Sequence, residues 1–446
     1  MSARGEFSSR IGFVLAAAGS AVGLGNIWGF PTQVASNGGA AFVLVYVLLA
    51  FVLAYPVLMA ELIIGRATRA NMVDALGKIS NSNLGRATGV WGFVTVSMIL
   101  AFYAIVAGWM ISYFFESFTQ IIGWDSASQW LTGSSMLRSL LFCGVFIALT
   151  ASIVVGGVSN GIERWSVRLM PTLILIILLL IGYVATLDGA LAGWKAYLVP
   201  DFSAIWDAGL LISAMGQAFF SMSLGVGTML VYGSYVSKNE NLPVLGASVA
   251  LVDIGVAILA GMLIIPAMYV ALNNGVQIFS ESGQLIAGDS LIFTVLPALF
   301  NTMGMVGYVV AFAFFALMVI AALTSSISML EVPVAYVVES KGLPRKKAVW
   351  MLIIFVMSSI IIVNFEQLFG LVISITTEYS QPLLGLALSI FVGWVWKRDQ
   401  ILAEIKQGNE QAEHSLFWKI WPWYLKFVCP VIILFMFVRS LNILDI

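Results

Sequence analysis

The stretch Gly19–Pro31 reads Gly-Ser-Ala-Val-Gly-Leu-Gly-Asn-Ile-Trp-Gly-Phe-Pro and lies in the middle of the first long apolar segment. Glycine and proline are poor helix formers, so this run predicts a helix that is broken near its midpoint. A bilayer tolerates open backbone only where it lines a cavity enclosed by protein or filled with water. A second such run, Ser223–Gly227, lies about 200 residues further on, in another apolar segment. Two interrupted helices at matching places in two halves predict the binding site of a secondary transporter.

The composition is typical of an integral membrane protein. Of 446 residues, 61% are hydrophobic and only 10% are charged, and the mean hydropathy is +1.00. Soluble proteins carry about 25% charged residues. Segments of about 20 apolar residues predict transmembrane helices. The expected spans, eleven in all, lie near 11–35, 40–65, 89–118, 138–156, 166–187, 208–235, 243–272, 304–338, 346–364, 368–397 and 417–438.

The charge distribution predicts the orientation. If the N-terminus is inside, 17 of the 21 Lys and Arg residues fall on the cytoplasmic side, as the positive-inside rule requires. We therefore expect a multi-pass protein of the plasma (inner) membrane, surrounded by lipid, with its N-terminus in the cytoplasm and its C-terminus outside. Both cysteines, Cys143 and Cys429, lie in apolar spans and indicate no disulfide framework.

Several classes of function are disfavoured. The single histidine, His414, leaves no Ser-His-Asp, Cys-His or histidine-rich metal constellation, so we do not expect an enzyme. The chain has no GxxxxGK[ST] loop for nucleotide hydrolysis. A net charge of −1 gives no reason to expect nucleic acid, and no obligatory protein partner is evident.

The chain is expected to form one membrane domain, 1–446, made of two repeats. The first five spans (about 9–187) pair with the next five (about 207–397), which places each break in the first helix of its half; the helix near 417–438 is an addition. The connection 273–303 contains the apolar run Leu291–Phe300 and predicts a helix-bearing hairpin that could act as a lid.

Individual residues indicate what the cavity binds. Asp253 lies in the middle of a span, where a carboxylate costs at least about 2.5–3.5 kcal/mol, so it should face a cavity and a cation. The opened helix offers free N–H groups of the Gly23–Gly25 turn to a carboxylate, and a half-helix N-terminus adds its positive dipole end. The hydroxyls of Thr324 and Ser325 indicate nothing alone, because such groups commonly bond to their own helix. Three roles are open for Glu378: a protonatable site used in transport, recognition of a cationic or hydroxylated substrate, and a structural role.

Five motifs occur in the order of a known family: Ala18–Asn26, Asn37–Ala40, Gly161–Arg164, Gln217–Gly225 and Leu323–Ser326. They resemble the neurotransmitter:sodium symporter family, particularly its bacterial amino-acid members of the leucine-transporter type. The resemblance implies an all-α 5+5 inverted-repeat fold with broken helices 1 and 6. It also implies uptake of an amino acid by alternating access, coupled to sodium.

The resemblance also assigns ligands for two Na⁺. The first site would be formed by Ala21, Asn26, Ser221 and Asp253, and the second by Gly19, Val22, Ala321, Thr324 and Ser325. Many relatives carry Asn where this chain has Asp253. A fixed negative charge there should make a chloride counter-ion unnecessary.

For the substrate, a small zwitterionic amino acid, the resemblance implies a site with an apolar lining. Its residues are Ser20, Ala21, Gly23, Gly25, Ile99, Tyr103, Phe220, Ser221, Ser223, Val226, Ser325 and Met329. The tyrosine would hold the carboxylate and Phe220 would act as a lid. The apolar lining implies a neutral, hydrophobic or aromatic amino acid. Two alternatives stay open: a sodium-coupled carrier of another amine or osmolyte, and a substrate-gated channel or sensor.

Gates are expected on both sides of the site. On the cytoplasmic side, Arg4 and Glu339 match a family pair, with Tyr235 nearby. On the outer side, Gly29 stands where relatives usually carry Arg, and Ile373 is the expected position of its acidic partner. With both charges missing, outer closure is expected to rely on Phe220, the tyrosine in helix 3 and the 273–303 lid.

Overall fold

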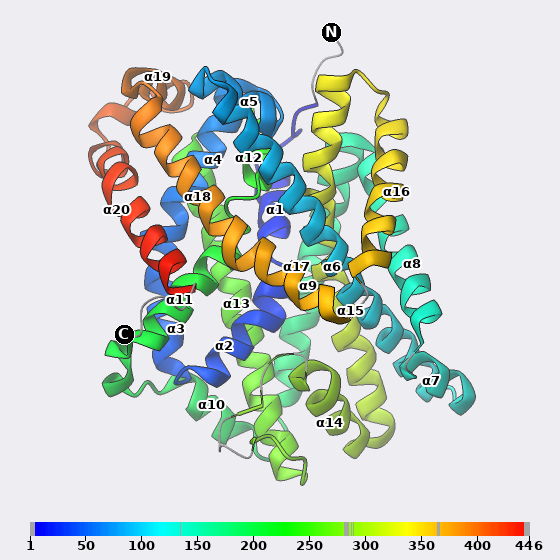
Figure 1. The fold of residues 1–446 in the computed structure, drawn as a ribbon. Helices are drawn as coiled ribbons and strands as arrows, with labels where there is room; N and C mark the ends of the chain where they lie inside the picture. The colour runs from blue at the N-terminus through cyan, green and yellow to red at the C-terminus, as the bar shows by residue number, and fades with distance from the viewer. Residues whose placement is uncertain are drawn as a thin grey trace.

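The computed structural model describes residues 5–133, 135–280, 285–286, 288, 290–363 and 366–440. These ranges are almost entirely helical and contain no β-strand, only an isolated bridge between Phe279 and Leu285. The helices run roughly side by side between two ends of the molecule (Figure 1). The N-terminus, α5 (Met72–Ser80) and α19 (Arg398–Lys406) lie at the upper end of this view. The lower end holds α7 (Asp125–Thr132), α10 (Ala190–Leu198) and α14 (Leu296–Thr302).

The expected spans are present as long helices, several with π-helical turns. In chain order they are α1 (Arg10–Ala21) with η1 (Gly25–Gly29) and α2 (Phe30–Ser36); α3 (Ala40–Leu49) with η2 (Ala50–Ala54) and α4 (Tyr55–Thr68); α6 (Asn83–Ile121); α8 (Met136–Val155); η3 (Val158–Glu163) with α9 (Arg164–Val184); α11 (Ala208–Ser221) with α12 (Thr228–Gly233); α13 (Leu242–Asn273); α15 (Gly304–Lys341); α16 (Arg345–Val363); α17 (Glu366–Ile373) with η6 (Ser374–Ser380), α18 (Gln381–Ile390) and η7 (Phe391–Val395); and α20 (Leu416–Ser440). Short helices η4 (Phe202–Trp206), η5 (Leu291–Val295) and η8 (Ala412–His414) complete the connections.

The number of spans agrees approximately with the expected eleven. Within the described ranges, eight helices are long and apolar enough to cross a bilayer, or up to ten if each of two bent pairs is one span. One of these pairs is α1 with η1 and α2, which bends by 55°. The remaining expected span consists of α11 and α12, which are too short to be counted separately. The expected helix in the 273–303 connection is present as η5 and α14, although 281–284, 287 and 289 lie outside the described residues.

The first break occurs where the sequence predicts it. Helix α1 ends at Ala21 because Val22 is extended (φ −68°, ψ 103°), and helical structure resumes at Gly25. Helices α9, α13 and α15 pack around α1, so the break is enclosed by protein. This is the setting in which a bilayer tolerates open backbone.

The second break separates α11 from α12. Ser223, Gly225 and Gly227 have positive φ angles of 51°, 86° and 79°, a conformation that favours glycine. A Cβ atom at Gly225 would lie 2.5 Å from the carbonyl oxygen of Gln381, so a side chain here would prevent this segment from approaching α18. The glycines therefore allow the chain both to turn and to pack closely.

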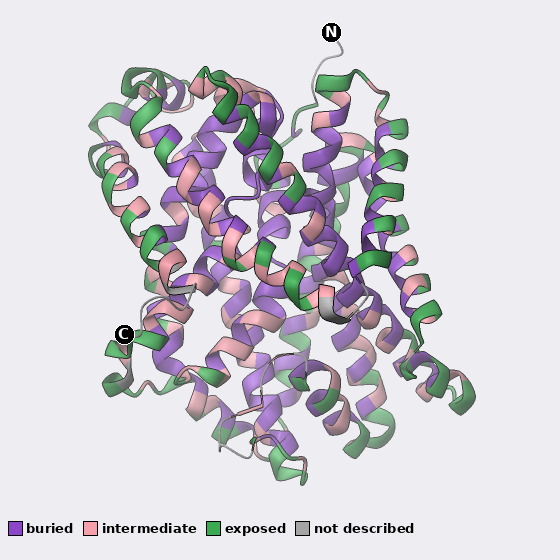
Figure 2. Ribbon diagram, in the orientation of Figure 1, coloured by how far each residue is buried: buried purple, intermediate pink, exposed green. Residues whose placement is uncertain are grey.

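The pattern of buried and exposed side chains is that of a protein surrounded by lipid. The helices at the centre are buried, whereas outer faces of peripheral helices such as α16 and α20 are exposed (Figure 2). Large apolar side chains cover these outer faces, among them Leu179 (64% exposed), Ile354 (67%) and Val431 (67%). Lipid tails would solvate such faces, since bilayer and side chains are equally apolar.

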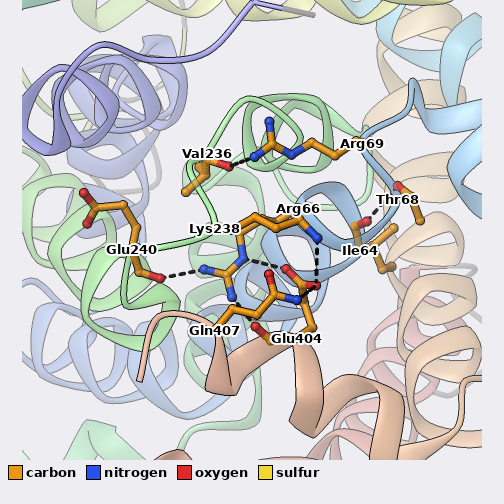
Figure 3. A network of polar contacts seen from close by, with 9 residues as sticks. All are labelled: Ile64, Arg66, Thr68, Arg69, Val236, Lys238, Glu240, Glu404 and Gln407. Carbon is orange, nitrogen blue, oxygen red and sulfur yellow. Dashed lines mark hydrogen bonds and ion pairs between the residues drawn. The ribbon is translucent and has the colours of Figure 1, made fainter. Parts of the chain in front are cut away.

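A buried charge cluster joins three segments at the upper end (Figure 3). The fully buried guanidinium of Arg66 in α4 donates to the Glu404 carboxylate (Nε–Oε1 2.7 Å) and to the backbone oxygens of Glu404 and Glu240 (2.5 Å each). Gln407 donates to Glu404 Oε2 (3.3 Å), and the Lys238 ammonium lies 3.8 Å from that atom. Arg66 thereby holds α19 and the loop after α12 against the end of α4.

Arg66→Met should destabilise the protein strongly. It removes one partner of a buried ion pair and leaves the other charge uncompensated, which costs about 3–5 kcal/mol. Lys238→Ala is the matched control, because its half-exposed ammonium (45% side-chain exposure) makes the weaker contact with Glu404. An exposed ion pair contributes only about 0–1 kcal/mol to the free energy of unfolding, so the control variant should lose little stability. The measurement is the midpoint of thermal unfolding in detergent, which should be lower for Arg66→Met than for Lys238→Ala. Equal midpoints would contradict the assigned role of Arg66.

Candidate functional site

A small central cavity lies where the two breaks meet. Eleven of the twelve residues expected to contact substrate line it, and it also includes Leu24 and Gln381. Those eleven are Ala21, Gly23, Gly25, Ile99, Tyr103, Phe220, Ser221, Ser223, Val226, Ser325 and Met329. Ser20 lies beside the lining: its hydroxyl donates to Ser328 Oγ (2.6 Å) and its carbonyl accepts from Ser223 Oγ (3.4 Å). The cavity volume is only about 30 Å³, so its walls must move to admit any amino acid.

Asp253 forms one polar cluster beside this cavity. Its fully buried carboxylate accepts hydrogen bonds from Asn26 Nδ2 (2.8 Å) and Ser221 Oγ (2.8 Å). Asn26 Nδ2 also lies 2.9 Å from Ser221 Oγ, to which Tyr46 donates (3.2 Å). No Lys, Arg or His of the described ranges forms an ion pair with Asp253. The cluster is rich in oxygen atoms and carries one uncompensated negative charge, a donor set that suits a hard monovalent cation.

The second polar cluster joins α1 to α15. Ser325 Oγ donates to the carbonyls of Val22 (3.1 Å) and Gly19 (3.4 Å). Thr324 Oγ1 donates to the Ala321 carbonyl (3.0 Å) and lies 3.5 Å from that of Val22. All five residues expected at the second ion site therefore lie together. Three carbonyl and two hydroxyl oxygens form a neutral cluster of oxygens suited to a cation.

Side chains also satisfy the peptide groups freed by the breaks. Leu24 N–H donates to Tyr103 Oη (3.1 Å), and Gln217 Nε2 donates to the Gly25 carbonyl (2.8 Å). Glu61 accepts from the backbone N–H groups of Gly225 (2.7 Å) and Leu230 (3.1 Å). Gln217 was expected only as part of the motif Gln217–Gly225, although a glutamine within an apolar span is itself a signal of a functional position.

A larger cavity of about 590 Å³, here called the outer cavity, opens on the side that the charge distribution predicts to face outward. Phe220 and Gln381 line both this cavity and the central one, so they separate the two. Besides Gly29, the lining contains Thr377 and Glu378, and it does not contain Ile373. Ile373, the expected position of the outer acidic residue, is the last residue of α17, and the π-helical turn η6 that follows it carries Thr377 and Glu378. Glu378 is an exposed carboxylate on this cavity rather than a group enclosed in the span.

A cavity of about 880 Å³, here called the inner cavity, opens on the side that the charge distribution predicts to face the cytoplasm. Tyr235 and Glu339, two of the residues expected to form the inner gate, line it; the third, Arg4, lies outside the described residues. Glu339 accepts from Asn71 N (2.8 Å). Nearby, burial raises the pKa of Asp74, but hydrogen bonds from Ser340 and Asn71 and the charges of Arg86 and Lys78 lower it overall. Asp74 is therefore ionised at neutral pH.

A buried group of charges behind the inner cavity was missed. Tyr235 donates to Glu331 Oε1 (2.7 Å), and the same carboxylate forms an ion pair with Arg345. Arg345 also donates to the Val154 carbonyl (2.8 Å), so it joins α8, α15 and α16. Glu331 was detectable in the sequence as a carboxylate within an apolar span.

Fold and site together define a membrane transporter in which two broken helices enclose a solute cavity. The profile of the Sodium:neurotransmitter symporter family matches residues 4–140 and 133–445. The chain belongs to this family, as its motifs predicted. The prediction that it is not an enzyme is also confirmed, because the relatives are sodium-dependent transporters.

Individual relatives cover nearly the whole chain. An uncharacterized sodium-dependent transporter of Bacillus subtilis, YhdH, is 36% identical over 99% of this chain and 98% of its own length. A sodium-dependent serotonin transporter of Drosophila melanogaster is 27% identical over 98% of this chain and 76% of its own. The crystal structure of MhsT in complex with L-phenylalanine superposes with a TM-score of 0.81. That chain is 36% identical, and the match covers 98% of this chain and 100% of MhsT.

Gly23→Ala should weaken sodium binding at least about tenfold, which corresponds to about 1.4 kcal/mol. The added Cβ would lie 2.4 Å from Ser325 Oγ and 2.6 Å from Tyr103 Oη, so it would displace groups around the second cluster. Gly29→Ala is the control, since its nearest contact would be 3.4 Å away. The measurement is the rise of the thermal midpoint with sodium concentration. Identical sodium curves for both variants would be incompatible with this prediction.

Proposed function

We propose that the protein takes up a neutral, hydrophobic or aromatic amino acid together with sodium, by alternating access and without chloride. The observation that carries this proposal is the buried Asp253 carboxylate, whose hydrogen-bond partners Asn26 and Ser221 are neutral. A buried charge without a counter-charge is strongly unfavourable, so this site requires a cation. Membership of a sodium symporter family supports sodium as that cation.

Two sodium ions are proposed as co-transported cargo. One would take oxygens of Ala21, Asn26, Ser221 and Asp253. The other would take the carbonyl and hydroxyl oxygens of the second cluster. With a membrane potential of about 100 mV and a tenfold gradient, two ions supply about 7 kcal/mol, enough for about 10⁵-fold accumulation of a neutral solute.

The substrate would be held by the open backbone. Its carboxylate would meet the Gly23–Gly25 turn and Tyr103, at the positive end of the half-helix that begins there. Its ammonium would meet carbonyls near Ala21 and Ser221. The apolar side chains of Ile99, Val226 and Met329 favour an uncharged side chain, and the L-phenylalanine bound to MhsT supports this choice.

Inner and outer gates would open alternately. Phe220 is proposed as the outer lid because it lines both the outer and the central cavity. Tyr235 and Glu339 are proposed for the inner gate together with Arg4. The two repeats, 9–187 and 207–397, would supply the moving and static helices, with the N-terminus in the cytoplasm and the C-terminus outside. For Glu378, exposure to the outer cavity favours contact with an arriving cation or proton.

The direct test is uptake of radiolabelled L-phenylalanine into proteoliposomes that contain the purified protein. We expect L-phenylalanine to accumulate when a sodium gradient is directed inward, at equal rates in chloride and in gluconate. When potassium replaces sodium on both sides, we expect no uptake. A panel of unlabelled amino acids, amines and osmolytes identifies the preferred solute by competition. Sodium-dependent uptake of an osmolyte instead of L-phenylalanine would support the alternative carrier, and conductance without uptake would support a channel or sensor.

Asp253→Asn should lower the apparent sodium affinity about tenfold or more, because it removes the charge that attracts the first ion. Chloride should restore part of the loss, since a small anion can replace the missing negative charge. The exposed Asp188 gives the control variant Asp188→Asn, which should behave like the unmodified protein. Sodium titrations of L-phenylalanine binding, each in chloride and in gluconate, provide the measurement. A strict chloride requirement in the unmodified protein would rule out the fixed-charge role of Asp253.

A further inference from the structure

Gln381 at the start of α18 is a buried polar residue that neither the motifs nor the predicted site include. Its side chain lines both the central and the outer cavity and is 3% exposed. Its carboxamide oxygen, Oε1, is buried and has no hydrogen-bond partner in the part of the chain that the structure describes. Folded proteins pair nearly all such atoms, so an unpaired acceptor at a binding cavity points to a ligand that supplies the donor.

The backbone of Gln381 is held in place from two sides. Ser380 accepts a hydrogen bond from Trp91 Nε1 of α6 (3.2 Å). The Gln381 carbonyl lies against Gly225 of the second break, so closely that a Cβ there would be 2.5 Å away. The π-helical turn η6 precedes the residue and Pro382 follows it. These contacts place Gln381 next to the second break, in the cavity lining that it shares with Val226.

Other polar side chains of the lining already have partners. Ser325 donates to the Val22 carbonyl, Ser223 donates to the Ser20 carbonyl, and Tyr103 accepts from Leu24 N–H. Three further buried polar atoms without a partner occur in the described ranges, in Thr32, Ser139 and Trp194, and none of these residues lines the central cavity. Gln381 therefore differs from every other buried polar residue of the described chain.

We propose that Gln381 determines specificity by accepting a hydrogen bond from the substrate's side chain. The preferred amino acids would be those whose apolar side chain carries one donor, such as an indole N–H or a phenolic hydroxyl. This inference rests on the proposed amino-acid transport and extends it to the substrate class. A purely aliphatic or phenyl side chain would leave Oε1 unpaired, and such a loss reduces affinity about ten- to a hundredfold.

The test compares L-tryptophan with β-(3-benzothienyl)-L-alanine, in which sulfur replaces the indole N–H. The indole N–H is only a donor, so it reports on the acceptor Oε1 and not on the amide nitrogen. Both compounds displace labelled L-phenylalanine from the purified full-length protein in sodium. In the unmodified protein, L-tryptophan should bind at least about tenfold more tightly than its sulfur analogue.

Variants then assign the preference to Gln381. Gln381→Met keeps the volume but removes the acceptor, so the ratio of the two affinities should fall to about one while L-phenylalanine binding persists. Gln381→Glu retains an acceptor and should retain the preference. Thr377→Val is the control, because Thr377 lines the outer cavity only.

Several results would overturn the inference. Equal affinities in the unmodified protein would do so even if Gln381→Met failed to fold. A common loss of affinity for both compounds in Gln381→Met would assign Gln381 to the ammonium group or to folding, and would also contradict the proposal. If labelled L-phenylalanine does not bind in sodium at all, the proposed function itself is wrong, an outcome that is distinct from failure of the Gln381 assignment alone.

Discussion

Glu61 accepts hydrogen bonds from the backbone N–H groups of Gly225 and Leu230, in the interior of a molecule that is otherwise mostly apolar. Each broken helix exposes peptide groups that the regular helix would have paired, and lipid cannot pair them. Glu61 stabilises the second break, while Tyr103 and Gln217 contact freed groups of the first. Without these long polar side chains the two breaks would be unfavourable, and the cavity between them could not exist.

The same breaks create the polar clusters. Helix α1 ends at Ala21 and α11 ends at Ser221, and the carboxyl end of a helix carries a partial negative charge. Asp253 adds a full negative charge at the place where these ends meet. The two effects have the same sign, so both would attract a cation to this side of the cavity. A substrate carboxylate would be repelled there and would find its favourable place at the N–H groups that begin the next half-helix.

Sequence reasoning was most successful where local chemistry determines the structure. The glycines of Gly19–Gly25 and Ser223–Gly227 predict both breaks, because few other residues adopt the required backbone. The family motifs then led to nearly all residues that line the central cavity. Predictions from the sequence failed where the face that a helix turns toward the cavity depends on packing between distant segments. The π-helical turn η6 was not predicted; its residue Glu378 lines the outer cavity together with Gly29, whereas Ile373, just before the turn, does not. Likewise, the pairing of Glu331 with Arg345 joins two helices, and no local pattern specifies that contact.

The two sides of the cavity are closed by different kinds of contact. On the outer side the separating residues are Phe220 and Gln381, which are uncharged, and no ion pair occurs among the described residues that line that cavity. On the inner side, Glu331 forms a buried ion pair with Arg345, and Arg69 pairs with Glu6 at 2.5 Å. Separation of buried charges requires water to enter and solvate both, whereas an aromatic ring moves without that cost. If Phe220 is the outer lid, closure on that side would depend mainly on what fills the space next to its ring. Opening of the inner side would instead require separation of charges, and salt weakens the exposed pair more than the buried one.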